Sequence, residues 1–279
     1  MKSFFGLVLT GLLVMNGQLR AESTTTVATS IKPVSMIVKA IGGDKVEITQ
    51  IVSNSASPHD FALRPSDLNK IHKADLVVWV GESLEPFLEK PIANSQHAKT
   101  AIEWMTLVGT EENGIEEEEH HGDEEEGHEG ERDQHNLGHH HEGLDPHVWL
   151  DLNNALALAK SITLKLSALN PEEKTYFQTN LLSFEHSLDL ADKENRRLLS
   201  NLNDVNYVVF HDAYGYFEAH YGLDHLANIS LSPERKPGAK KIVAIRKLMK
   251  EEEVACIFSE VQFNPAIVNA LVDGTKVKS

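Results

Sequence analysis

The chain has 279 residues, of which 42 are acidic and 26 basic, and its formal net charge is −16. Fourteen of the acidic residues but only one basic residue, Arg132, lie between residues 111 and 142, so this segment carries −13 of the total. Phosphate binding needs clustered Lys and Arg, so the composition excludes nucleic acid as a partner, whereas the acidic segment favours a cation.

The first residues are typical of a secretory signal. Lys2 precedes an apolar run from Phe4 to Met15, which is shorter than the about 20 residues that span a membrane. We expect residues 1–21 to be a signal peptide cleaved near Ala21, with a short membrane anchor as the alternative. The protein is then periplasmic, and its single cysteine, Cys256, has no partner for an internal disulfide.

Short β-branched runs alternate with amphipathic segments in the first half of the mature chain. Helices are predicted at 33–42, 65–74 and 82–93. Strands are predicted at 25–30, 45–52, 75–81 and within 100–108. This β-α-β alternation indicates a mostly parallel sheet with helices on its faces.

A helical region follows the acidic segment, and the alternation then resumes. Helices are predicted at 151–169 and from 171 to about 202, the second being about 45 Å long at 1.5 Å per residue. The closing strands are predicted at 205–210, 226–231 and 254–260, and the closing helices at 213–221, 239–252 and 265–274. The last residues, 275–279, resemble the opening of another strand, so the last βα unit is expected to be missing.

The predicted fold class is therefore α/β, with two lobes of mostly parallel sheet joined by one long rigid helix. The N-terminal lobe is expected at 22–170, with the acidic His-rich loop at 111–142. The linking helix is expected at 171–203 and the C-terminal lobe at 204–279. A cleft between the lobes is the expected ligand site.

Three histidines outside the acidic loop share a local context. His59, His147 and His211 each follow a predicted strand or end one, and ligands bind outside the carboxyl ends of strands in open α/β sheets. The neighbouring carboxylates that could accept the second ring N–H of each are Asp60, Asp145 and Asp212. We interpret the three histidines as ligands of one metal ion; neutral imidazole suits zinc, copper and nickel.

The other histidines fall into two groups. Those interpreted as structural are His72, His97, His186, His220 and His225. Those of the acidic loop are candidate weak metal ligands, since His-rich tracts bind metal and carboxylates concentrate cations; they are His120, His121, His128, His135, His139, His140 and His141. For the fourth coordination position we expect water first, with a loop histidine or Glu260 as alternatives.

Four stretches together resemble one known family: "SPHDFALRPSDLNKIHKADLVVWVGESLEPFLEKP", "DPHVWLDLNNA", "YVVFHDAYGYFEAHYGL" and "SEVQFNPAIV". They are similar to the periplasmic zinc-binding components of bacterial ABC uptake transporters, of the ZnuA type within the cluster of metal-receptor binding proteins. The resemblance implies ligands at His59, His147 and His211, a rigid connecting helix, and a permease with its ATPase as partners. It favours zinc, because relatives that take manganese carry a carboxylate where His211 stands.

The resemblance also implies a departure near the end of the chain. The family continues for another strand and helix beyond a segment similar to Gly274–Val277, and that continuation supplies an acidic residue near the metal. Close relatives also carry a second cysteine there, which would pair with the residue matching Cys256.

The predicted function is high-affinity periplasmic zinc capture by a monomer, with zinc as the transported ligand. One alternative is a periplasmic zinc hydrolase, since three histidines and a water also form catalytic sites. The sequence lacks the H-E-x-x-H and G-x-S-x-G motifs, so we expect no enzyme activity. A freestanding zinc buffer is the second alternative.

Overall fold

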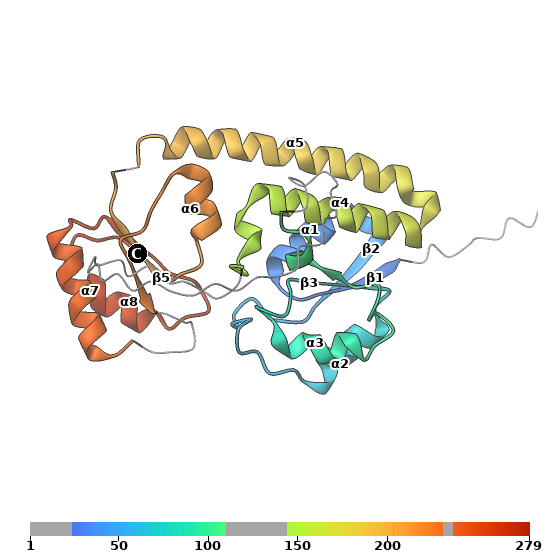
Figure 1. The fold of residues 1–279 in the computed structure, drawn as a ribbon, viewed down its shortest axis with the longest axis horizontal. Helices are drawn as coiled ribbons and strands as arrows, with labels where there is room; N and C mark the ends of the chain where they lie inside the picture. Colours follow the sequence, from blue (N-terminus) through green and yellow to red (C-terminus); the bar gives the residue numbers. More distant parts are fainter. Residues whose placement is uncertain (1–23, 110–143, 203, 231–236) are drawn as a thin grey trace, which may run out of the picture.

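The computed structural model describes residues 24–109, 144–202, 204–230 and 237–279, and it contains two parallel sheets with helices packed against them (Figure 1). The predicted signal peptide and the whole of the acidic loop, including its seven histidines, lie outside the described residues. The α/β class and the parallel strands predicted from the alternation are confirmed.

The first sheet has the strand order β2-β1-β3-β4, with every pair parallel. Its strands are β1 (Thr25–Thr29), β2 (Val46–Gln50), β3 (Leu76–Trp79) and β4 (Ile102–Glu103). All four residues of β3 are buried, as its continuous apolar sequence predicts for a strand covered on both faces. The edge strand β4 is only two residues long, because the chain turns at once into the 3₁₀ helix η2 (Trp104–Leu107).

Helices cover both faces of this sheet. Figure 1 shows α1 and α4 on one side and α2 and α3 on the other. Their bounds are α1 (Lys32–Gly42), α2 (Pro65–Lys73), α3 (Pro86–Ala93) and α4 (Leu152–Leu169), with the 3₁₀ turns η1 (Gly43–Lys45) and η3 (Val148–Leu150). Pro33 lies in the first turn of α1 and Gly43 ends the helix with φ +55°, as the sequence predicts.

The second sheet has the order β6-β5-β7, again parallel. Its strands are β5 (Tyr207–His211), β6 (Ala227–Ser230) and β7 (Cys256–Phe258). Its helices are α6 (Gly215–Tyr221), α7 (Ala239–Glu251) and α8 (Pro265–Val272). A separate apolar core joins β5, β6 and β7 to α7 and α8, so each sheet has a core of its own.

The long helix α5 (Lys174–Leu199) runs beside both halves (Figure 1). Near its start, Asn180 Nδ2 donates to the Ile41 carbonyl of α1 at 2.8 Å. Near its end, Asp192 Oδ1 lies 2.7 Å from His220 Nε2 of α6. At 1.5 Å per residue its 26 residues span about 39 Å, less than expected, because residues 171–173 form the separate 3₁₀ turn η4 (Pro171–Glu173).

The last residues lie beside β7. Lys278 bridges Cys256 in parallel, and the Ile257 N–H donates to the Lys278 carbonyl at 2.8 Å. Cys256 is half-buried, and burial raises the pKa of its thiol. Among the described residues, no helix has the length and apolarity needed to cross a membrane.

Candidate metal site

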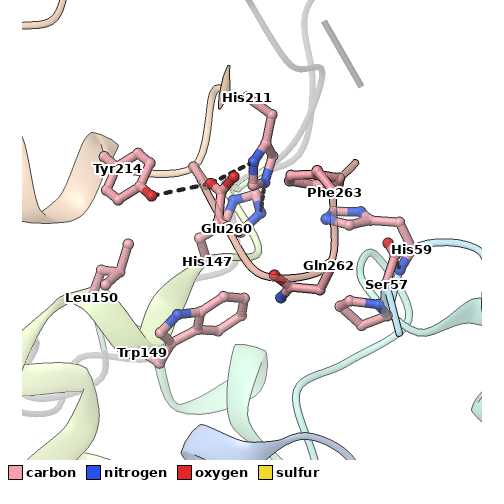
Figure 2. A pocket seen from close by; sticks show the side chains of 12 residues that line it. Ser57, His59, His147, Trp149, Leu150, His211, Tyr214, Glu260, Gln262 and Phe263 are labelled. Atoms are coloured by element: carbon pink, nitrogen blue, oxygen red, sulfur yellow. Dashed lines mark hydrogen bonds and ion pairs between the residues drawn. The ribbon is translucent and has the colours of Figure 1, made fainter. Parts of the chain in front are cut away.

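His59, His147 and His211 come from three separate elements and meet in one cleft. His59 lies in the loop between β2 and α2, His147 precedes η3, and His211 is the last residue of β5. Figure 2 shows their rings gathered in one pocket. The pocket has a volume of about 200 Å³ and is lined by residues from both halves of the chain. The structure therefore brings together the three histidines predicted from the sequence.

The ligand atoms of the three imidazoles all lie within 4.8 Å of one another. The ring centroids are 5.2 Å apart for His147 and His211, 5.4 Å for His59 and His147, and 6.1 Å for His59 and His211. The two Nε2 atoms of His147 and His211 are 3.4 Å apart. Both of these rings are more than nine-tenths buried, and His59 is half-buried.

A carboxylate faces the outer nitrogen of two of these rings. Asp145 Oδ1 lies 2.6 Å from His147 Nδ1 and also accepts the His147 backbone N–H at 3.0 Å. Glu260 Oε1 lies 2.9 Å from His211 Nδ1. We call Asp145 and Glu260 the outer carboxylates. A carboxylate accepts hydrogen bonds, so the contact with Asp145 favours the tautomer of His147 that has its proton on Nδ1 and turns the lone pair of Nε2 to the cleft. Glu260 stands beside the corresponding nitrogen of His211.

Tyr214 fixes Glu260 in turn. Its hydroxyl donates to Glu260 Oε1 at 3.0 Å (Figure 2), and burial together with the charge of Glu260 raises the pKa of Tyr214, so it stays a donor. His211 Nδ1 lies 2.9 Å from Glu260 Oε1, but the two groups are not aligned for a hydrogen bond. Among the described residues, His211 Nδ1 and Glu260 Oε2 are therefore both buried without a hydrogen-bond partner.

Two aromatic side chains that the sequence analysis did not single out line the site and pack against the histidine rings. Trp149 packs edge-on against His147 with ring centroids 5.2 Å apart, and Phe263 packs in the same way against His211 at 5.3 Å. Such walls limit the rotation of each imidazole. Trp149 lies two residues after a predicted ligand, which is a weak signal; the sequence near Phe263 carries no such signal.

The structure confirms some of the roles predicted for the neighbouring carboxylates and the other histidines, and contradicts one. The prediction for Asp145 is confirmed, but the one for Asp212 is wrong, because His211 Nδ1 faces Glu260 instead. Glu260, the alternative fourth ligand, does not belong to the group formed by the three histidines, because its carboxylate lies beside the ring of His211. Two histidines interpreted as structural have carboxylate partners and do not line the cleft, His220 with Asp192 and His225 with Glu218.

Converging imidazoles, outer carboxylates and a cleft between two α/β halves define a metal-binding protein rather than a nucleotide- or sugar-binding one. The family model described as "zinc-uptake complex component A periplasmic" matches residues 27–279. The chain belongs to this family, the periplasmic zinc-binding proteins of zinc ABC uptake systems. It is accordingly a binding protein and not an enzyme, and the hydrolase alternative is set aside.

Curated relatives and solved structures agree with this assignment. A "High-affinity zinc uptake system protein ZnuA" of Yersinia pestis is 36% identical over 263 residues, covering 92% of this chain and 82% of that one. Its counterpart in Haemophilus ducreyi is 40% identical over 256 residues, covering 90% and 82%. The periplasmic zinc binding protein TroA from Treponema pallidum has a similar fold, with a TM-score of 0.72 at 21% identity, covering 92% and 87%.

Proposed function

We propose that the chain captures zinc with high affinity in the periplasm through His59, His147 and His211 and delivers it to the permease of an ABC transporter. The observation that carries this proposal is the 3.4 Å separation between Nε2 of His147 and Nε2 of His211. At this distance either one nitrogen donates a proton to the other or a cation between them accepts a lone pair from each. The family's role in zinc uptake supports the cation.

The separation also suits zinc in size. Around a tetrahedral ion with Zn–N bonds of about 2.0–2.1 Å, two ligand nitrogens are about 3.3–3.4 Å apart. His147 and His211 are thus spaced for zinc already, and both are held by buried surroundings. His59, half-buried on a loop, is the ligand we expect to move inward when zinc binds.

Water is our proposal for the fourth position. Glu260 faces the outer nitrogen of His211, so its carboxylate serves the site better as a support of that ligand than as a ligand itself. The seven histidines of the acidic loop are proposed to collect zinc weakly. Deleting residues 111–142 should then remove weak zinc sites in calorimetry and leave one tight site; loss of the tight site would contradict the ligand assignment.

The domain organisation is part of the same proposal. Residues 1–21 export the protein, residues 22–170 and 204–279 form the two lobes, and the helix within 171–203 joins them. A monomer with a stiff connecting helix favours small shifts and loop ordering over wide hinge closure as the signal of zinc occupancy. The permease, and through it the ATPase, would read that signal.

The ligand assignment is tested by replacing each proposed ligand with alanine. His59→Ala, His147→Ala and His211→Ala should each lose bound zinc in elemental analysis and lose the tight phase in calorimetry. His186→Ala is the matched control, because this histidine is exposed on α5. Zinc content equal to that of the unchanged protein in all three variants would disprove the assignment.

The delivery step needs a separate experiment. A strain lacking this protein should grow poorly when zinc is chelated, and the unchanged chain should restore growth only when the transporter's permease is present. Restoration without any permease would instead favour a freestanding zinc buffer.

A further inference from the structure

The segment Tyr214–Tyr216, at the start of α6, lies against both outer carboxylates. We infer that Tyr214 and Tyr216 are positioning residues of the metal site, which hold the supports of His211 and His147 in place from a single element. This inference rests on the proposed function, because it assumes that those two histidines bind the metal. It adds that the arrangement of the two halves of the molecule controls zinc affinity through this segment.

The first contact is between Tyr214 and Glu260. The Tyr214 hydroxyl donates at 3.0 Å to the same oxygen, Oε1, that faces His211 Nδ1 at 2.9 Å. The other oxygen, Oε2, is buried and receives no hydrogen bond from the described residues. The Tyr214 hydroxyl therefore sets the rotation of this carboxylate. Without it, Glu260 can turn and withdraw the carboxylate oxygen that faces His211 Nδ1.

The second contact is between the start of α6 and Asp145. The Tyr216 hydroxyl donates to the Asp145 backbone carbonyl at 3.0 Å. The intervening Gly215 is so close that an added Cβ would lie 3.4 Å from Asp145 Oδ2. Asp145 is thereby held at its backbone and approached at its carboxylate, on the opposite side from its bond to His147 Nδ1.

These contacts connect the two halves of the chain. Tyr216 belongs to α6, next to β5, yet its ring packs against the core of the first sheet. Asp145 lies just before η3 and α4 of the first half, whereas Glu260 follows β7 of the second. Since His211 ends β5 and Tyr214 follows three residues later, a shift of β5 and α6 relative to the first sheet moves both tyrosines relative to Asp145. Zinc affinity then depends on how the halves are docked.

The test removes single hydroxyl groups and measures zinc affinity by competition with a chelator at constant pH. Tyr214→Phe and Tyr216→Phe should each bind zinc about tenfold more weakly or worse, the loss typical of an outer-shell change. Tyr176→Phe is the control: its hydroxyl donates to Asp44 Oδ1 at 2.8 Å, away from the cleft, so its affinity should not change. The visible spectrum of bound Co²⁺ should shift in the first two variants and not in the third.

A double-mutant cycle separates positioning from a general loss of stability. If Tyr214 acts through Glu260, the pair Tyr214→Phe and Glu260→Gln should bind zinc no more weakly than Glu260→Gln alone. Full additivity would overturn the inference, and so would unchanged zinc affinity in both tyrosine variants, whatever their thermal stability. His211→Ala, measured in parallel, separates a failure of the proposed function from a failure of the inference. If His211→Ala still binds zinc tightly, His211 is not a ligand and the proposed function fails. If it loses tight binding, the proposed function stands and the tyrosine variants test the inference alone.

Discussion

Glu85 is a buried acid whose ionisation should make the stability of the protein depend on pH. It lies immediately before α3, its side chain is fully buried, and burial raises its pKa to about 7 from a usual value of 4.5. Val80 N–H donates to Oε2 at 2.8 Å, which partly offsets the burial. The Ser30 hydroxyl also lowers the pKa, although no aligned hydrogen bond joins it to the carboxyl and Oε1 remains unsatisfied among the described residues.

The sign of the effect follows from the direction of this shift. Below the unfolded value of 4.5, the carboxyl is protonated in both states and costs nothing. As the pH rises from 4.5 towards 7, the unfolded chain ionises first, so the folded state loses stability. Above pH 7, the free energy of unfolding has fallen by its full amount, about 3 kcal/mol, because the pKa of Glu85 is about 7 in the folded state and 4.5 in the unfolded chain.

Glu85→Gln removes the charge and keeps the shape, so it should be more stable than the unchanged protein at alkaline pH. Its advantage should be about 2.5 kcal/mol larger at about pH 8 than at about pH 5. Urea unfolding with a chelator present, so that metal adds nothing, measures this difference. Glu89→Gln on the exposed face of α3 is the control and should show no such widening. An equal advantage for Glu85→Gln at both pH values would refute the reasoning.

Three further predictions concern the site and the scaffold. Asp145→Asn should weaken zinc binding about 10- to 100-fold in chelator competition, because the amide supports His147 Nδ1 less strongly than the carboxylate does; unchanged affinity would contradict this. Gly43→Ala should lower the free energy of unfolding by more than the roughly 1 kcal/mol expected in the left-handed helical region, because φ +55° with ψ −129° lies outside that region and its Cβ would clash with the Tyr176 hydroxyl. Gly222→Ala, at φ +67° and ψ +38° with open space around it, should cost only the smaller backbone amount, and equal losses in urea unfolding would contradict this. Zinc at 100 times the dissociation constant of the unchanged protein should stabilise the folded state by about 2.7 kcal/mol in thermal unfolding. An equal gain at the same zinc concentration in a variant lacking one proposed ligand would argue against that ligand.

The fold was predictable wherever local pattern decides the structure. The β3 strand is apolar throughout and fully buried, and α1 begins with a proline and ends at a glycine, so periodicity and end signals suffice for both. The edge strand β4 shows the limit. Its length depends on how far it can pair with β3, and Trp104 instead turns inward and donates from Nε1 to the Asn154 carbonyl at 2.8 Å. That partner lies 50 residues away along the chain, so no local pattern reports it.

The meeting of His59, His147 and His211 was predictable from the sequence, and the carboxylates beside them only partly. The carboxyl ends of strands are where ligands gather, which is why His211 could be assigned from its place after an apolar run. Asp212 could not be judged in the same way, because consecutive residues at a strand end point in opposite directions. Glu260 reaches His211 because β7 lies next to β5 in the sheet, and strand order is a tertiary fact that adjacency in the sequence does not contain.

The placement of the outer carboxylates bears on the choice of metal. On the proposed ligand set, neutral imidazoles bring no negative charge to a divalent cation, and carboxylates behind the rings can supply part of the charge that balances it. Asp145 and Glu260 stand there, each bonded or close to a ring nitrogen that faces away from the cleft. Because their oxygens are turned to the rings, a cation in the cleft meets nitrogen before carboxylate oxygen, an arrangement that suits zinc and disfavours the harder cations magnesium and manganese. On the proposed ligand set, the preference for zinc should therefore depend on the orientation of these two carboxylates, which is the feature that we infer the tyrosines at the start of α6 to control.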